Sequence, residues 1–180
     1  MRKVLLGIFY GLLGLFLIAV AGGYALPGKA HVERSASINA SAEKIYAIVS
    51  DLQRNKEWSP WTAMDPAIEL SYSGPNNGAA GVGQKMSWVS KNPQVGTGSQ
   101  EVTELVPNER MVSALEFSGT KAAATFALQP DGTDTKVVWS FDATLSGVAE
   151  RWFGLLFDRL IGPDLEKGLV NLKTLSEAQG

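Results

Sequence analysis

The polar residues of this sequence leave little scope for catalytic chemistry. The chain has no cysteine and a single histidine, His31. Thiol chemistry is therefore excluded, and a histidine-based metal site or a serine–histidine triad is disfavoured. The spacing of the remaining polar residues matches neither a metal-ligand motif nor a phosphate-binding loop. We therefore predict no metal ion and no cofactor.

Glu104 is the one residue for which the sequence supports a catalytic role. Gln84, Gln100 and Glu104 fall on expected strands, where alternation with apolar residues would point them into the domain. Of the three, only Glu104 can exchange a proton at physiological pH, as a general acid or base must. The alternative is that Glu104 faces water, and the sequence leaves both open.

The aromatic residues indicate binding of an apolar molecule instead. Large aromatic side chains either fill a solid core or line a cavity for an apolar ligand, and both uses require the same residues. Gly168 bears on this choice, because a glycine inside a helix either permits close packing or leaves room for a ligand. The predicted ligand-binding residues are Trp58, Trp61, Met86, Trp88, Phe117, Phe126, Trp139, Phe141, Trp152 and Leu156.

Apolar periodicity predicts the elements that position these residues. Alternation predicts a strand at His31–Ile38, and two short helical segments follow between Asn39 and Trp58. From Ala67 to Phe141, short alternating segments are separated by turn residues such as proline, asparagine and glycine. Successive strands joined by tight turns indicate an antiparallel meander.

The most helical stretch of the chain outside the N-terminal segment is Gly147–Leu175, where apolar residues recur every three or four positions. Proline fits the first turn of a helix and breaks its middle. We therefore predict two helical segments, or one helix kinked, at Gly162–Pro163. The aromatic residues of the meander are expected to face this helix, opposite Trp152 and Leu156.

The N-terminal segment from Val4 to Leu26 carries no charge and is long enough to cross a bilayer. Ala19–Ala21 resembles the cleavage site of a signal peptide, but the apolar run continues beyond it. We therefore expect residues 1–26 to be a transmembrane anchor, with a cleaved signal peptide as the alternative, and residues 27–31 to be a linker.

The charges at the ends of this segment give a predicted orientation. Arg2 and Lys3 lie at its N-terminal end, which favours an N-terminus inside and a domain on the outer, periplasmic side of the inner membrane. Gly7 and Gly11 have the spacing of a helix-pairing motif, which would allow a weak homodimer through the anchor. Chance spacing in a glycine-rich segment is the alternative.

The net charge bears on the class of partner. The formal charge is −2, and it is two units more negative without Arg2 and Lys3. A mildly acidic domain is a poor partner for polyanions, so we do not expect nucleic acid binding.

Five segments resemble the bacterial SRPBCC, or polyketide cyclase/dehydrase, group of the START-like (Bet v 1-like) superfamily. They are Val32–Trp61, Gly81–Ser90, Gly96–Val112, Phe126–Asp142 and Gly162–Lys173. The resemblance implies an α+β helix-grip fold over residues 32–178, in which a curved antiparallel sheet wraps around a long C-terminal helix. It also implies a cavity between sheet and helix, and anchored members carry a similar N-terminal hydrophobic helix.

Members of this group include lipid and hormone carriers as well as cyclases, so the resemblance specifies function less closely than fold. We expect a membrane-anchored protein that binds a small hydrophobic molecule or a lipid in the cavity. The alternative is a polyketide cyclase/aromatase-like or hydrolase-like enzyme that uses the same cavity. The third interpretation is a structural or interaction domain with a filled core.

Overall fold

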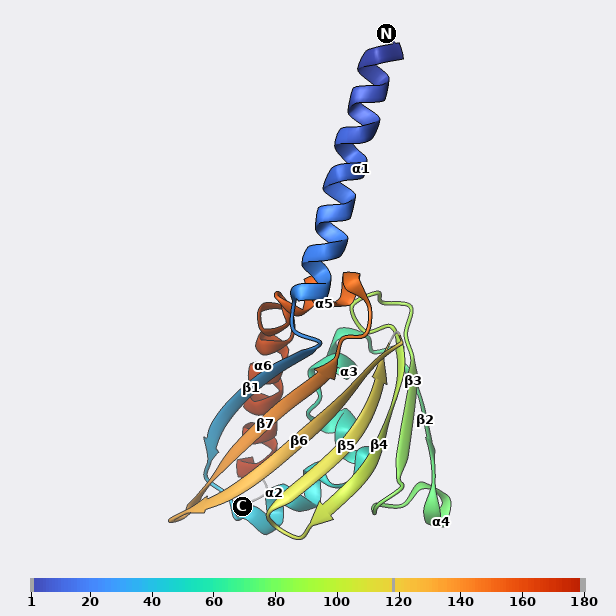
Figure 1. The fold of residues 1–180 in the computed structure, drawn as a ribbon. Helices are drawn as coiled ribbons and strands as arrows, with labels where there is room; N and C mark the ends of the chain where they lie inside the picture. The colour runs from blue at the N-terminus through green and yellow to red at the C-terminus, as the bar shows by residue number, and fades with distance from the viewer. Residues whose placement is uncertain (1, 118, 179–180) are drawn as a thin grey trace.

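The computed structural model describes residues 2–117 and 119–178 and shows an apolar helix that projects from a curved sheet (Figure 1). The helices are α1 (Arg2–Ala25), α2 (Ala42–Val49), the 3₁₀ helix η1 (Leu52–Glu57), α3 (Pro60–Met64), α4 (Pro75–Gly78), α5 (Val148–Gly154) and α6 (Phe157–Ala178). The strands are β1 (Lys29–Ile38), β2 (Glu69–Ser73), β3 (Lys85–Val89), β4 (Thr97–Val106), β5 (Arg110–Phe117), β6 (Thr120–Asp131) and β7 (Asp134–Thr144).

The seven strands form one antiparallel sheet in the order β1-β7-β6-β5-β4-β3-β2. Consecutive strands from β2 to β7 are neighbours, and β1 pairs with β7 to complete the sheet. The sheet curves around α6, α2 and α3, which lie on its inner side (Figure 1). The predicted meander, and the predicted curved sheet with a C-terminal helix, are confirmed.

The inner face of the sheet is apolar because side chains alternate along each strand. On β7, Val137, Trp139 and Phe141 are buried, whereas Lys136 and Asp142 on the other face are exposed. Burying an apolar side chain of this size contributes about 1.5–3 kcal/mol. The inner face of β6 and β7 therefore forms the centre of the core.

Helix α6 lies along β1 and is fixed there by a glycine contact and an ion-pair cluster. A Cβ atom on Gly168 would lie 2.5 Å from the Trp139 ring, so this glycine allows close packing and leaves no room for a ligand. On the neighbouring flank, Arg34 of β1 bonds Glu166 at 2.6 Å and Asp158 at 2.7 Å. Hydrogen bonds to Asp158 and Glu166 raise the pKa of Arg34, and the same contact lowers the pKa of Asp158.

Of the two alternatives predicted at Gly162–Pro163, separate helical segments or one kinked helix, the first is wrong. Helix α6 runs through Pro163, and the interruption lies earlier, at Leu155–Leu156, between α5 and α6. Pro163 and Arg159 are exposed, so water can replace the hydrogen bond that the Arg159 carbonyl loses. Gly162 is required for a different reason, because a side chain at this position would collide with the guanidinium of Arg34.

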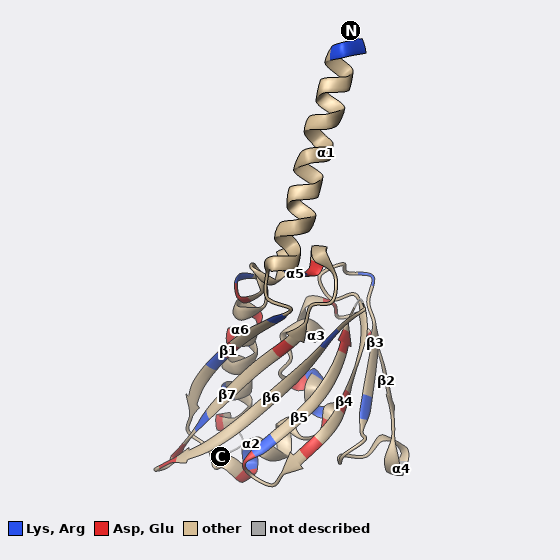
Figure 2. Cartoon of the chain, in the orientation of Figure 1, with Lys and Arg blue, Asp and Glu red and all other residues tan. Residues whose placement is uncertain are grey.

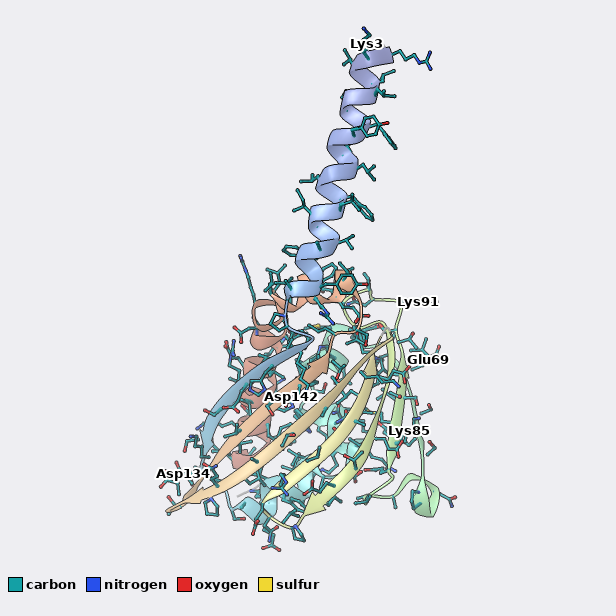
Figure 3. The ribbon with its side chains drawn as sticks, viewed as in Figure 1. Lys3, Glu69, Lys85, Lys91, Asp134 and Asp142 are labelled. Atoms are coloured by element: carbon teal, nitrogen blue, oxygen red, sulfur yellow. The ribbon has the colours of Figure 1, made fainter. Side chains whose placement is uncertain are left out.

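Helix α1 differs from the rest of the molecule in both exposure and charge. Most of its side chains point outward on all sides, although Gly23 is buried against α5, and its charges lie at the N-terminal tip, around Lys3 (Figures 2 and 3). Among the described residues, α1 is the one helix long and apolar enough to span a bilayer.

Candidate functional site

Five of the predicted ligand-binding aromatics form one cluster between the sheet and the helices. Trp139 stacks on Phe126 at a centroid distance of 4.8 Å, and the Trp58 ring meets Trp139 edge-on at 5.3 Å. Trp61 contacts Trp139 at 5.8 Å and Phe141 at 6.0 Å. Four of the five are at most 8% exposed, and Trp61 is half-buried. These rings fill the inner face beside α6 as a packed core.

The position of Trp58 and Trp61 follows from α3, which comes after the two helical segments expected between Asn39 and Trp58. Pro60 begins α3, as proline favours the first turn of a helix. Trp58 and Trp61 therefore flank a short helix packed against α6, and the Trp58 carbonyl accepts a hydrogen bond of 3.0 Å from Asn171 Nδ2.

A second set of apolar side chains extends the inner face to the end of the sheet nearest α1. Leu70 lies opposite Trp88 on the neighbouring strand. Gly98 lies between Trp88 on one side and Phe117 on the other. Leu70, Trp88 and two further side chains of this face are half-buried, and Phe117 is 38% exposed. We call this set the α1-side apolar surface; its members are Leu70, Tyr72, Trp88, Leu115 and Phe117.

The α1-side apolar surface is only half-buried because α6 packs along β1, at the other side of the sheet. Small residues continue the same face: Gly98 lies beneath the Trp88 ring, and Ala122 lies opposite Leu115. Met86, between Tyr72 and Gln100 in the register, is 5% exposed and joins this surface to the core.

Polar atoms with no partner among the described residues lie in this interior. They include the indole nitrogens of Trp58 and Trp139 and the hydroxyl of Tyr72. An unpaired buried donor costs about 1–3 kcal/mol. Burial, and secondarily the charge of Asp51, raise the pKa of Tyr72, so its hydroxyl keeps its proton and can donate. These donors suit an oxygen acceptor on a ligand or a water molecule.

Sequence reasoning missed Tyr72, although alternation on its strand contained the signal. Tyr72 lies two residues after Leu70, and residues two apart on a strand share a face. β2 has five residues and two of them are serines, so its apolar alternation is weak.

Glu104 faces water, which is the second of the two orientations that the sequence left open. A β-bulge shifts the register of β4 between Val102 and Glu104, and the extra residue moves Glu104 from the inner to the outer face. Glu104 is 46% exposed there and forms an ion pair with Arg110. Leu105 takes the inner position opposite Met111. The structure gives Glu104 no access to the apolar interior.

The two glutamines expected beside Glu104 do face inward, and both are occupied structurally. Gln84 accepts from Leu52 N at 2.9 Å and donates to Asp51 Oδ1 at 2.7 Å, which joins β3 to the start of η1. Gln100 Nε2 donates to Ser113 Oγ at 2.8 Å between neighbouring strands. Their hydrogen bonds hold the sheet and its neighbouring helix together.

Asp164 is a further ionisable group close to the interior. It lies inside α6, one turn before Gly168, on the flank that faces α3. Burial raises its pKa, an effect that the charge of Lys167 opposes. Asp164 therefore holds its proton to a higher pH than an ordinary aspartate, a property that suits a general acid.

Trp152 and Leu156 do not face the sheet as predicted. Trp152 is 43% exposed and Leu156 is 47% exposed, because the chain bends between α5 and α6 and α5 packs against α1. Two of the predicted residues thus lie outside the interior that the other aromatics share.

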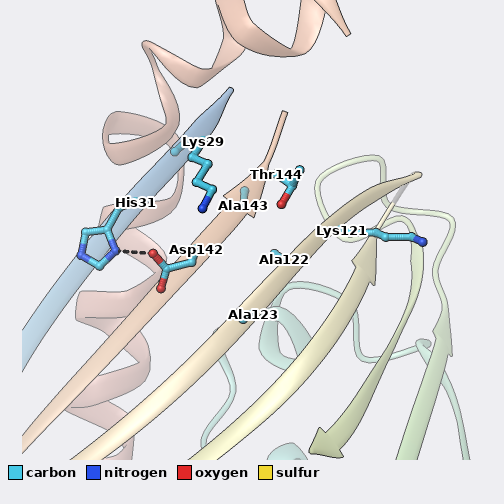
Figure 4. A pocket seen from close by; sticks show the side chains of 9 residues that line it. Lys29, His31, Lys121, Ala122, Ala123, Asp142, Ala143 and Thr144 are labelled. Atoms are coloured by element: carbon cyan, nitrogen blue, oxygen red, sulfur yellow. Dashed lines mark hydrogen bonds and ion pairs between the residues drawn. The ribbon is translucent and has the colours of Figure 1, made fainter. Parts of the chain in front are cut away.

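Two surface hollows lie outside the space between sheet and helix. One, of about 600 Å³, is on the outer face of β1, β7 and β6, where His31 Nδ1 and Asp142 Oδ1 are 2.8 Å apart (Figure 4). Lys121 points away from this pair, and the surface between is formed by alanines (Figure 4). The other hollow, of about 650 Å³, includes Pro107 and Pro130 near the far end of the sheet. Neither hollow contains a predicted ligand-binding residue.

The fold matches solved structures with little sequence identity. A START superfamily protein from Mycobacterium smegmatis is 20% identical, with a TM-score of 0.60 over 83% of this chain and 99% of its own. Norcoclaurine synthase from Thalictrum flavum, solved with dopamine and hydroxybenzaldehyde, is 14% identical, with a TM-score of 0.64 over 84% of this chain and 88% of its own. The di-domain ARO/CYC StfQ from the steffimycin biosynthetic pathway is 11% identical, with a TM-score of 0.64 over 84% and 52%.

These matches establish the START-like helix-grip fold and, at such identities, the fold alone. A search of curated proteins found no match to this chain. The family model described as polyketide cyclase/dehydrase and lipid transport matches residues 29–177, which is most of the chain. The chain therefore belongs to the polyketide cyclase/dehydrase and lipid transport family.

Proposed function

We propose that this protein is a membrane-anchored binding protein for a small hydrophobic molecule or a lipid. The observation that carries the proposal is the α1-side apolar surface, which is half-buried at the end of the sheet nearest α1, a helix long and apolar enough to span a bilayer. The family description, which includes lipid transport, supports the same class of ligand.

The proposed ligand combines an apolar body with an acceptor oxygen. Covering apolar surface contributes about 25 cal/mol per Å², so an acyl or isoprenoid chain is held without an ion pair. The unpaired hydroxyl of Tyr72, a member of the α1-side apolar surface, favours a carbonyl, ester or ether oxygen on that chain. Because no charge contributes, affinity should depend weakly on ionic strength.

The proposed anchor is α1, with the N-terminus inside and the domain on the periplasmic side of the inner membrane. Arg2 and Lys3 lie at the inner end of α1 in this orientation. Full-length protein should resist extraction by alkaline carbonate, and a reporter joined after Gly180 should be active outside the cytoplasm. Release by carbonate would contradict the anchor, and a reporter active only in the cytoplasm would contradict the orientation.

The anchor also carries the proposed weak homodimer. A Cβ atom on Gly7 or Gly11 would meet nothing within 4 Å, so this face is free to pair with a second α1. Cross-linking in membranes should depend on Gly7 and Gly11, and an unchanged yield in a Gly7→Leu, Gly11→Leu variant would exclude pairing through this motif.

The ligand proposal is tested with a fatty acid that carries a photoactivatable diazirine. Ala122 and Ala123 are a matched pair, since they are adjacent on β6 and face opposite sides of the sheet. Ala122→Phe should fill the inner face and reduce labelling of the peptide around Leu115 several-fold, whereas Ala123→Phe should leave labelling unchanged. Equal labelling in both variants, or no labelling of β2–β5, would contradict binding at this surface.

The second candidate that we propose is an enzyme of the cyclase or hydrolase type, in which Asp164, on the flank of α6 that faces α3, is the acid. The raised pKa of Asp164 and its position facing α3 suit proton donation to a bound molecule. Asp164→Asn should then abolish turnover of an aromatic polyketide or ester substrate and leave labelling by the diazirine probe intact. Turnover unaffected by Asp164→Asn would exclude this residue as the acid.

A further inference from the structure

The segment around α5 exposes an unusual concentration of large apolar side chains. We call it the α5 patch; its members are Trp152, Phe153, Leu155, Leu156 and Leu160. These five side chains are between 43% and 65% exposed. A contiguous exposed apolar set on a folded domain marks contact with a membrane or another molecule.

The charged residues inside α5 are occupied by local hydrogen bonds. Glu150 Oε2 accepts from Ser146 N at 2.6 Å and from Gly147 N at 3.0 Å at the start of the helix. Arg151 Nη1 donates to the Tyr24 carbonyl at 3.1 Å and to the Leu26 carbonyl at 3.3 Å. The outward face of α5 therefore presents apolar side chains.

These contacts fix α5 against the end of α1. Trp152 Nε1 donates to the Ala19 carbonyl at 3.0 Å, and a Cβ atom on Gly22 would lie 3.3 Å from the Trp152 ring. A Cβ atom on Gly23 would lie 2.5 Å from the Val148 side chain. The small residues of α1 at this point thus admit α5, and the depth of α1 in a membrane determines the depth of α5.

The length of α1 gives that depth. A hydrocarbon core of about 30 Å is crossed by about 20 helical residues at about 1.5 Å each. Counted from Val4, the first residue after Arg2 and Lys3, the core ends near Gly23. Trp152 contacts Ala19 and Gly22, which lie before that boundary. With α1 placed in the bilayer in this way, Trp152 is at the edge of the acyl chains, the depth at which tryptophan is enriched.

We propose that the α5 patch is inserted into the bilayer interface. The domain then contacts the membrane surface directly, in addition to its connection through α1. The proposal rests on the membrane anchoring proposed above for α1. Its occupant is the lipid bilayer, because the patch runs from α5 into the start of α6, and α5 packs against α1, whose large apolar side chains are exposed. Arg159, exposed beside Leu160, then reaches the headgroups.

This placement has a consequence for the ligand. The α1-side apolar surface lies at the same end of the sheet as α5 (Figure 1). With the patch inserted, that surface faces the bilayer, and an apolar molecule can pass between lipid and protein with little exposure to water.

The test uses the absence of cysteine, which lets a single introduced cysteine carry a nitroxide spin label. Full-length protein in liposomes is labelled in separate variants at Phe153→Cys, Leu156→Cys, Phe9→Cys in the middle of α1, and Asp131→Cys in the far hairpin. Collision rates with oxygen and with a water-soluble nickel chelate report depth. We expect oxygen-to-nickel ratios at positions 153 and 156 several-fold above that at position 131, and the highest ratio at position 9.

The outcomes separate the two proposals. Ratios at 153 and 156 equal to that at 131, with a high ratio at 9, would overturn patch insertion and leave the anchor intact. A low ratio at 9 would overturn the anchor and patch insertion together. An inserted patch with no diazirine labelling would refute ligand binding alone. Quenching of Trp152 by brominated lipids, measured against Trp152→Phe, repeats the depth measurement without an added label.

Discussion

Gly168→Ala tests whether the interior beside α6 is filled. The methyl group would lie 2.5 Å from the Trp139 ring and 3.2 Å from Pro60 Cδ. Carbon atoms in favourable contact are about 3.5–4.0 Å apart, so the ring must move by about 1 Å or more. Trp139 is 2% exposed and stacks on Phe126 at 4.8 Å, so it cannot move alone.

The expected magnitude is the difference between two opposing effects. Overpacking a core by one methyl group costs about 1–3 kcal/mol, and replacing glycine by alanine inside a helix contributes about 1 kcal/mol of stability. Because the Trp139 ring is enclosed, we expect the upper part of the first range, and a net loss of about 1–2 kcal/mol. The assay is urea unfolding of the full chain in a non-ionic detergent, monitored by far-UV circular dichroism.

Two further variants control this measurement. Val170→Ala, at a position 62% exposed on the same helix, changes helix propensity without packing and should raise stability slightly. Trp139→Phe removes the atoms that collide, so Gly168→Ala should cost at least about 1 kcal/mol less in that background. A gain of stability for Gly168→Ala in the wild-type background would refute the packed interior and reopen this side of the sheet as ligand space.

The remaining predictions concern α6. Pro163→Ala should raise the free energy of unfolding by about 1–3 kcal/mol, because proline is disfavoured inside a helix; a lower urea midpoint would show that the proline sets a bend the domain needs. The raised pKa of Asp164 stabilises the folded state below pH 3.8, and that stabilisation is lost as the pH rises through the folded-state pKa. Asp164→Asn, which carries no charge, should therefore raise stability at neutral pH; an unchanged pH profile would contradict this. Arg34 lowers the pKa of Asp158, so the Asp158 carboxylate stabilises the fold above pH 3.8. That stabilisation is lost as the pH falls through the folded-state pKa. Asp158→Asn should therefore flatten acid unfolding, and a slope equal to that of the wild type would show the ion pair to be without effect on stability.

The fold was predictable because the strands carry strong period-two patterns and the helices carry caps. Thr135 to Phe141 alternates in the sequence, and the structure buries the expected face. Ser41 Oγ accepts from Lys44 N at 3.3 Å and caps the start of α2, which lies within the first of the expected helical segments. Signals of this kind depend on residues that are close in the sequence, so contacts between distant segments do not alter the structure they predict.

The site was less predictable because its geometry depends on contacts between distant segments. Glu104 left the inner face through a one-residue bulge that alternation cannot reveal. Gly162 was read as a helix break, but its partner is Arg34, distant in the sequence on β1. Trp152 fits the apolar stripe of a single helix, whereas its indole is paired with α1.

Chain topology explains why α1, the α5 patch and the open part of the inner face share one end of the molecule. β1 and β7 are antiparallel neighbours, with Lys29 opposite Thr144, so the start of β1 and the end of β7 meet there. α1 leads into β1 and α5 follows β7, and both must emerge at this end. α6 then runs back along β1, fixed by Arg34 on one flank and by the Gly168–Trp139 contact on another. Since α6 cannot shift towards β2 without breaking both contacts, the α1-side apolar surface stays uncovered where the chain would meet a bilayer.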